Sequence, residues 1–361
     1  MVKHLSGCRI STEWMFKGMR TLIMENEYLR IVVLLDKGSD IIEFLYKPLD
    51  VDFMWHSPLG YRNPSMFVET CSRMDGSFLD YYGGGWQDIL PNAGGACAHR
   101  GAEWGQHGET ALIPWRCTIE KETSEEVIAH LNTKCYRYPF TIDKWIILRR
   151  KEKILTIREK LTNESEQSLE FSWLQHLTFG EPFLSPKCVI DLAAETVLTH
   201  TQEIPGSILP VKRKFKWPVV EGKHEENIDL SRIPPKNVRS HDLAYLMDLR
   251  EGWYGITNTE MKLGFGLIWD KNVYPYIWFW RPLGGAWDYP WFGRAWAIGL
   301  EPCTSWPATG LIDQIKEGTA AKINGKSSIE TEIKAVVYTG FKRVKNLFAD
   351  GTVEGVEEEN S

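Results

Sequence analysis

Short runs in which apolar and polar residues alternate recur along the chain, and this pattern limits the fold more than any other feature of the sequence. Between Ile154 and Leu161, Leu155 and Ile157 point to one face while Arg158 and Lys160 point to the other, which is the period of a strand with one solvated face. Similar runs bounded by turn residues predict strands at Leu29–Leu35, Ile41–Tyr46, Ala111–Glu120, Val127–Thr133, Trp145–Arg150, Ile154–Leu161, Leu169–Leu174, Cys188–Leu192, Leu243–Leu249, Leu263–Trp269, Tyr276–Trp280, Arg294–Leu300 and Ser328–Thr339. Only Gly310–Glu317 is predicted to be helical. The pattern therefore predicts an all-β fold in which large antiparallel sheets pack as a sandwich.

The predicted strands extend from Thr21 to Val344 without a change in composition that would mark a second domain. We therefore predict a single β domain over residues 1–347 that includes a short N-terminal extension. The charged, proline-bearing segment 212–238 is expected to be a surface excursion of that domain. From Phe348 onward acidic residues replace apolar ones, so residues 348–361 are predicted to form a disordered acidic tail.

Tryptophan is unusually frequent, with 16 in a chain of 361 residues whose formal net charge is −6. A protein that binds the phosphate backbone of a nucleic acid needs a basic surface, so this composition argues against a nucleic-acid partner. Indole rings suit sugars, because the C–H face of a sugar stacks on the ring while its hydroxyls reach polar groups. One group of tryptophans lies in the last third of the chain: Trp278, Trp280, Trp287, Trp291, Trp296 and Trp306.

Neither a membrane segment nor a secretion signal is expected. The longest purely aliphatic run is Ile31–Leu35, whereas a spanning helix takes about 20 apolar residues. The N-terminal sequence MVKHLSGCRISTEWMFKG has polar residues throughout and lacks an apolar signal core. The cysteines are dispersed without a C-x-x-C pair and predict reduced thiols in the cytoplasm: Cys8, Cys71, Cys97, Cys117, Cys135, Cys188 and Cys303.

Four stretches combine glycine, histidine, acid and tryptophan in ways that strand packing does not require. They are YYGGGWQDILPNAGG (Tyr81–Gly95), WGQHGETALIPW (Trp104–Trp115), SWLQHLTFGEPF (Ser172–Phe183) and RAWAIGLEPCTSWP (Arg294–Pro307). The three consecutive glycines of the first stretch permit a sharp turn or a close approach to a ligand. It contains no phosphate-loop motif.

Three side chains in these stretches are candidates for a catalytic or binding role. For each of them a purely structural role is the alternative interpretation. His107 lies in a loop and is otherwise a surface histidine. His176 interrupts an apolar strand near a turn and needs a hydrogen-bond partner if it is buried. Glu301 follows a predicted strand and precedes a proline, so it lies at a sheet rim or caps it. His99, His107 and Glu109 match no familiar zinc spacing, and we predict no metal site.

Taken in order, these motifs resemble those of the galactose mutarotase (aldose 1-epimerase) family between about Arg20 and Gly340. His176 in QHLTFGEPF and Glu301 in GLEPCTSWP resemble the catalytic His and Glu of that family, and His107 in GQHGE resembles its earlier His. Asp242 in SHDLAYL resembles its substrate-binding Asp. The sequence departs from the family at PNAGG, which replaces an Arg-containing motif, and Tyr276–Trp296 resembles the uncharacterised branches. The resemblance implies a β-supersandwich with a broad open cleft.

Interconverting two anomers requires a base that removes the proton of the C1 hydroxyl and an acid that protonates the ring oxygen. The resemblance implies that Glu301 is the base, ionised near pH 7 because its reference pKa is about 4.3, and that His176 is the acid. No cofactor is required. The remaining candidates are assigned to the sugar itself, three to orient hydroxyls and three to stack on the ring: His107, Asp242, Arg281, Trp86, Trp280 and Trp287.

Two other functions remain open from the sequence. A glycoside hydrolase needs paired carboxylates, and Glu301 has Glu109 or Asp288 as possible partners. A non-catalytic carbohydrate-binding protein would use the same aromatic cleft. The expected partner in each case is a carbohydrate, and for the epimerase a monosaccharide. An anionic substituent on it would suit Arg281 and Arg294, because guanidinium binds such groups bidentately.

Overall fold

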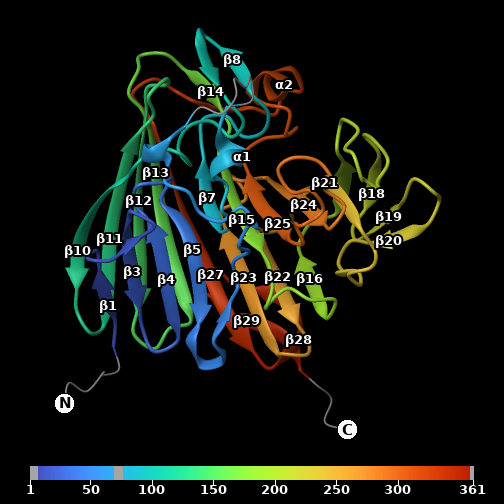
Figure 1. The fold of residues 1–361 in the computed structure, drawn as a ribbon, viewed down its shortest axis with the longest axis horizontal. Coiled ribbons are helices and arrows are strands. Elements are labelled where there is room, and N and C mark those ends of the chain that lie inside the picture. Colours follow the sequence, from blue (N-terminus) through green and yellow to red (C-terminus); the bar gives the residue numbers. More distant parts are fainter. Residues whose placement is uncertain (1–6, 69–75, 358–361) are drawn as a thin grey trace.

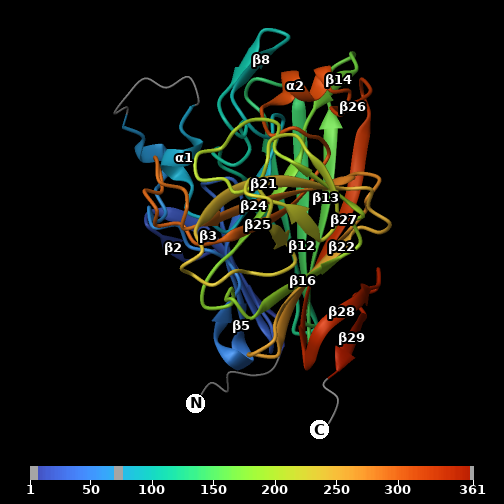
Figure 2. The same cartoon turned by 90° about the vertical axis from the view of Figure 1, so that its right-hand side faces the viewer.

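The computed structural model describes residues 7–68 and 76–357. Two large antiparallel β-sheets make up most of the fold and lie against each other as two layers (Figures 1 and 2). Both described ends of the chain lie at the same end of the layers. This confirms the predicted all-β fold with few short helices. No helix in these two ranges is both long and apolar enough to cross a membrane.

The first layer is a 13-stranded sheet in the order β1-β3-β4-β5-β7-β15-β25-β24-β21-β17-β18, with β2 beside β3 and β6 beside β5. Its strands are β1 Arg9–Ser11, β2 Met15–Phe16, β3 Met19–Glu25, β4 Leu29–Leu34, β5 Asp40–Tyr46, β6 Val51–Asp52, β7 Trp86–Ile89, β15 Leu174–Phe179, β17 Thr196–Thr199, β18 Lys214–Lys216, β21 Ser240–Met247, β24 Tyr276–Leu283 and β25 Ile298–Cys303.

The second layer is an 8-stranded sheet in the order β10-β11-β12-β13-β27-β23-β22-β16. Its strands are β10 Arg116–Glu122, β11 Glu126–Lys134, β12 Phe140–Arg149, β13 Ile154–Asn163, β16 Cys188–Leu192, β22 Trp253–Asn258, β23 Leu263–Trp269 and β27 Ser328–Thr339. Small hairpins and helices surround the layers: β8 Cys97–His99 with β9 Ala102–Trp104, β14 Leu169–Phe171 with β26 Ala321–Ile323, β19 Val219–Glu221 with β20 Asn227–Asp229, β28 Phe341–Leu347 with β29 Val353–Glu357, α1 Phe78–Tyr81, α2 Leu311–Lys316, and 3₁₀ turns at Lys47–Leu49 and Pro64–Met66.

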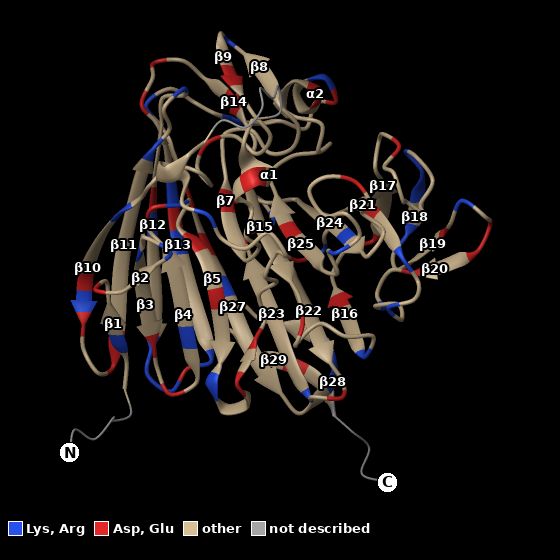
Figure 3. Ribbon diagram, in the orientation of Figure 1, with Lys and Arg blue, Asp and Glu red and all other residues tan. Residues whose placement is uncertain are grey.

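The core lies between the two sheets and follows directly from the alternation in the sequence. In β11, Val127, Ala129 and Leu131 are fully buried while the residues between them are partly exposed. Many of the charged residues lie on loops and at the ends of strands (Figure 3). The first sheet differs in its middle: β7, β15 and β25 are buried on both faces, because a second cluster of apolar side chains covers the face turned away from the core.

Several predicted boundaries are wrong where aromatic residues occur in loops. The predicted strand Arg294–Leu300 begins only at Ile298, and the first residues of Ala111–Glu120 form turns before β10. The predicted strand Leu169–Leu174 is divided between β14 and β15, which pair with different neighbours. His176 consequently lies within β15 and not beside a turn.

The two ends of the predicted domain are more structured than expected. Strand β1 joins the first sheet by pairing with β3, so the N-terminal extension is part of the fold from Arg9 onward. Strand β29 pairs with β28, which corrects the predicted disordered tail over 353–357: despite the acidic composition, Val353 lies opposite Leu347 and packs against the apolar cluster that contains it. Residues 358–361 and Cys71 lie outside the described residues, and the six described cysteines are free thiols.

Candidate active site

Strands β15 and β25 place His176 and Glu301 side by side on the outer face of the first sheet. The two strands are antiparallel, and Thr178 pairs with Gly299. Two residues before Thr178 and two residues after Gly299, His176 and Glu301 lie opposite each other, and both side chains point to the same face. The distance from His176 Nε2 to Glu301 Oε1 is 3.6 Å. The sequence motifs around both residues therefore meet in space.

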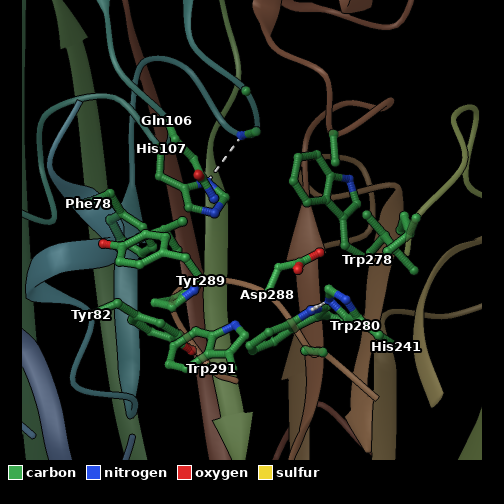
Figure 4. A pocket seen from close by; sticks show the side chains of 18 of the residues that line it. Phe78, Tyr82, Gln106, His107, His241, Trp278, Trp280, Asp288, Tyr289 and Trp291 are labelled. Atoms are coloured by element: carbon green, nitrogen blue, oxygen red, sulfur yellow. Dashed lines mark hydrogen bonds between the residues drawn. The ribbon is translucent and has the colours of Figure 1, made fainter. Parts of the chain in front are cut away.

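Both side chains open into a cavity of about 440 Å³, which is within the usual range for a small-molecule site. Figure 4 shows Phe78 and Tyr82 on one side of the cavity and Trp278 and Trp280 on the other. The loop that follows β24 adds a further wall: Trp291 packs against Trp280 with ring centroids 6.1 Å apart. Aromatic side chains from α1 and β24 thus enclose the space above the His–Glu pair.

Burial shifts the pKa values of both members of the pair toward their neutral forms. Removal of the carboxyl group from water raises the pKa of Glu301 well above its usual value, and removal of the imidazole from water lowers the pKa of His176 to about 3. Burial thus opposes the ionisation of Glu301 that its reference pKa predicts near pH 7. It favours a resting pair in which the one exchangeable proton is on the carboxyl group.

Gly299 has no side chain and so leaves room for the carboxyl group of Glu301. A Cβ built at Gly299 would lie 2.2 Å from Glu301 Oε1, so the carboxyl group occupies the space in which a side chain would stand. Oε1 itself has no hydrogen-bond partner among the described residues. Glu301 lines the cavity, and this buried oxygen is one of the few polar atoms in the described residues left without a partner, which calls for an explanation at a ligand site.

His107 lies in the same cavity, as predicted, and its hydrogen bonding defines which nitrogen is available. The backbone N–H of Gly94 donates to His107 Nδ1 at 3.1 Å (Figure 4), which leaves Nε2–H as a donor. Gly94 has φ +95°, and a Cβ there would lie 2.4 Å from the carbonyl oxygen of Ala308. Burial and the neighbouring His176 hold the pKa of His107 well below its usual value, so His107 is a neutral N–H donor.

Of the three tryptophans predicted to stack on the ligand, two line the cavity and one does not. Trp280 forms part of the wall, and Trp287 lies at the mouth with 52% of its surface exposed. One face of Trp287 is covered by the guanidinium of Arg239, which is 5.1 Å from the ring centroid. Trp86 is fully buried and donates to Gln175 Oε1 at 2.7 Å between the sheets, so its predicted role in stacking is wrong.

Asp242 and Arg281 are also misassigned as ligand contacts. They lie opposite each other on β21 and β24, but their neighbours His241 and Trp280 are the residues that line the cavity. Alternation therefore turns Asp242 and Arg281 to the other face, where both are buried and 3.8 Å separates Arg281 Nη1 from Asp242 Oδ2. Arg294 donates from Nε to the carbonyl oxygen of Trp291 and also lies outside the cavity lining.

Sequence reasoning did not identify Tyr82 or His241 as cavity residues. Trp280 Nε1 donates to His241 Nε2 at 3.1 Å (Figure 4), so His241 holds the indole of the cavity wall. Tyr82 follows α1 and directly precedes the three glycines singled out in the sequence. That position beside a Gly-rich turn was the available signal for Tyr82. For His241, the available signal was that it directly precedes Asp242 in the sequence.

The two acidic residues considered as partners of Glu301 have different positions. The carboxylate of Glu109 accepts hydrogen bonds from Trp104 Nε1 at 3.0 Å and from the backbone N–H of Tyr136 at 2.6 Å, and it does not line the cavity. Asp288 lines the cavity from an exposed loop. Glu109 is thus a structural residue, and only Asp288 is available as a second carboxylate.

Solved structures of other proteins share this architecture. A Klebsiella pneumoniae protein provisionally named an aldose 1-epimerase has a TM-score of 0.71 and 14% identity, with 91% of this chain and 83% of that chain covered. A galactose mutarotase-like protein from Clostridium acetobutylicum has a TM-score of 0.65 and 13% identity over 92% and 99% of the two chains. A galactose mutarotase related enzyme from Lactobacillus acidophilus has 0.58 and 15% over 88% and 97%. The chain therefore has a galactose mutarotase-like fold.

No curated protein matches the sequence. One family does: residues 16–337 match the domain of unknown function DUF4432. Because the match covers most of both sheets and every residue that lines the cavity, the chain belongs to the DUF4432 family.

Proposed function

We propose that this protein interconverts the α and β anomers of a neutral aldose by general acid–base ring opening. The observation that carries the proposal is the pair His176 and Glu301, whose Nε2 and Oε1 atoms are 3.6 Å apart at the base of an aromatic cavity. An acid and a base beside one cavity are the two groups that ring opening of a hemiacetal needs. The fold shared with mutarotase-like proteins supports the same reading.

One exchangeable proton on the pair is sufficient for the reaction. In the form Glu301 carboxylate with His176 imidazolium, Glu301 removes the proton of the C1 hydroxyl while His176 protonates the ring oxygen. The C1–O5 bond breaks, the aldehyde forms, and the pair is left as carboxylic acid and neutral imidazole. Rotation about C1–C2 and the reverse proton transfers then close the ring on the other face. The resting form favoured by burial is the one that ring opening produces, and both forms have zero net charge.

The lining of the cavity supports a neutral sugar. Among the described residues that line it, none is a lysine or an arginine, whereas Glu301 and Asp288 are acidic. An anionic substituent requires a cationic partner, and the two arginines expected to supply one, Arg281 and Arg294, lie elsewhere. We therefore replace the anionic substituent considered from the sequence with a neutral aldose in this proposal.

Polarimetry of freshly dissolved single anomers tests the function. We expect the protein to accelerate equilibration of one or more neutral aldohexoses or aldopentoses, and to leave the matching 6-phosphates and uronates at the uncatalysed rate. Saturable binding without acceleration would instead indicate a carbohydrate-binding protein. Release of reducing sugar from oligosaccharides, lost in D288N and E301Q, would indicate a hydrolase. Acceleration of only anionic sugars would contradict the proposed substrate class.

Gly299→Ala is expected to lower kcat by roughly 10- to 100-fold, because the new methyl group would occupy the position of Glu301 Oε1, 2.2 Å from its Cβ, and small misplacements of a catalytic group are costly. The double variant G299A/E301Q provides the control. If Gly299 acts through Glu301, adding G299A to E301Q causes no further loss. A multiplicative loss in the double variant would show that Gly299 matters for another reason.

A further inference from the structure

A chain of hydrogen bonds leads from His176 back into the first sheet. Tyr82 Oη lies 3.4 Å from His176 Nδ1 and 3.1 Å from Thr178 Oγ1. Thr178 Oγ1 lies 2.9 Å from the carbonyl oxygen of Gly85. All three residues are at most 5% exposed, so the chain of hydrogen bonds is shielded from bulk water. Gly85 is the last of the three consecutive glycines in the sequence.

The carbonyl group at the end of this chain determines its direction. A carbonyl oxygen only accepts hydrogen bonds, and each hydroxyl has one hydrogen to donate. The single hydrogen of Thr178 therefore points to Gly85, so Thr178 Oγ1 accepts from Tyr82, and Tyr82 Oη accepts from His176 Nδ1–H. The reverse direction would turn oxygen lone pairs toward each other across the 2.9 Å between Thr178 Oγ1 and Gly85 O. Burial raises the pKa of Tyr82 well above its usual value, so the phenol keeps its hydrogen.

We propose that Tyr82 and Thr178 hold neutral His176 in the Nδ1–H tautomer, which leaves Nε2 as the one nitrogen that exchanges a proton with Glu301 and the sugar. Tyr82 is then a positioning residue of the proposed epimerase, and the catalytic part of this inference rests on that proposed function. The second cavity histidine has the opposite tautomer, because Gly94 N–H donates to His107 Nδ1. The site thus combines one ring nitrogen that accepts with another that donates.

The tautomer matters because of where Nε2 lies. Nε2 is the atom of His176 nearest the carboxyl group of Glu301, at 3.6 Å, and in the resting pair the carboxyl group carries the exchangeable proton. An unprotonated Nε2 gives that proton a place to go. In the Nε2–H tautomer, two protonated groups would face each other and the pair would contain no base.

The tautomer is measured directly, without any assay of activity, by two-bond ¹H–¹⁵N correlation spectra of histidine-labelled protein at neutral pH, with the signals of His176 assigned by their loss in H176N. We expect the unprotonated nitrogen of His176 to be Nε2 in the wild type. In Y82F we expect averaging between the two tautomers or a shift to Nε2–H. An Nε2–H tautomer in the wild type would overturn the inference while leaving the proposed function intact.

Kinetics then test the positioning role. Y82F and T178V are each expected to reduce kcat by roughly 5- to 10-fold with little change in KM, the effect of losing one hydrogen bond that orients a catalytic group, and T178S should recover most of the loss. Y61F is the matched control, because Tyr61 Oη makes the same 3.4 Å contact with Nδ1 of His56 outside the cavity lining. Equal losses in Y61F and Y82F, or an unchanged tautomer in Y82F, would contradict the inference. If no sugar is epimerised, the spectra still decide the tautomer.

Discussion

Glu301→Gln is expected to reduce the rate of mutarotation by a factor of about 10²–10⁴, the usual contribution of one positioned acid or base. Glutamine has nearly the same shape but neither accepts nor releases the exchangeable proton that the reaction moves between Glu301 and His176. The measurement is kcat for equilibration of a single anomer, with melting temperature as the control for folding. A variant that retained wild-type kcat on an accepted sugar would contradict the role of Glu301.

The same substitution is expected to leave the fold as stable as the wild type or more stable. Burial raises the pKa of Glu301, so the folded state favours the protonated carboxyl group. As the pH rises from the pKa of the unfolded chain to the raised pKa of the folded protein, the carboxyl group ionises more readily in the unfolded chain, and the wild type loses stability. A glutamine side chain, which does not ionise, has no such cost. The difference in melting temperature between E301Q and wild type should therefore increase toward alkaline pH, and a marked loss of stability at neutral pH would show that the carboxyl group has a structural role.

The pair also determines the pH dependence of the wild-type enzyme. Activity needs one exchangeable proton on the pair. It falls at low pH as His176, whose pKa burial lowers to about 3, becomes protonated beside a protonated Glu301. It falls again at high pH once Glu301 loses its proton above its raised pKa. We expect a bell-shaped profile of kcat/KM with apparent values that belong to the pair and not to either residue.

The sequence predicted the fold class and the residues whose neighbourhood is distinctive. His176, Glu301 and His107 occur in motifs whose order resembles that of the galactose mutarotase family, and the structure brings all three together. The alternation that predicted the outer strands is clear because one face of each meets water, as in β11.

The same signal fails in the middle of the first sheet. Strands β15 and β25 are buried on both faces, since one face meets the second sheet and the other meets the aromatic cavity. Periodicity then does not tell which face of these strands carries the site. On the neighbouring strand β21, a shift by one residue exchanges Asp242 for His241. Arg281 next to Trp280 is the same case. Trp86 was misassigned because a tryptophan beside a Gly-rich turn looks the same in sequence whether it faces the cavity or the core.

Lys144→Met is expected to lower the free energy of unfolding by about 3–5 kcal/mol, the usual cost of removing one partner from a buried ion pair. Lys144 on β12 contacts Asp88 on β7 across the two sheets, and both side chains are fully buried. Lys144 Nζ also lies 3.9 Å from Glu159 Oε1. Methionine keeps the length of the side chain but leaves Asp88 without its cation. Lys160→Met is the control, because Lys160 pairs with Glu330 at 3.1 Å on the exposed face and its loss should cost about 0–1 kcal/mol.

Glu159→Gln separates the effect of charge from the effect of packing in this cluster. Burial and the nearby Asp88 raise the pKa of Glu159 well above its usual value, whereas Lys144 and hydrogen bonds outweigh burial and lower the pKa of Asp88. At neutral pH the cluster therefore has one cation, one anion and one neutral acid. Gln175, the neighbour of His176 on β15, donates from Nε2 to Asp88 Oδ1 at 2.7 Å and to Glu159 Oε2 at 2.9 Å, and an amide at position 159 still accepts that bond. Urea unfolding at neutral pH should thus show E159Q equal to the wild type or more stable, while K144M is strongly destabilised. Equal destabilisation of both would mean that Glu159 is ionised and that the cluster has a net negative charge.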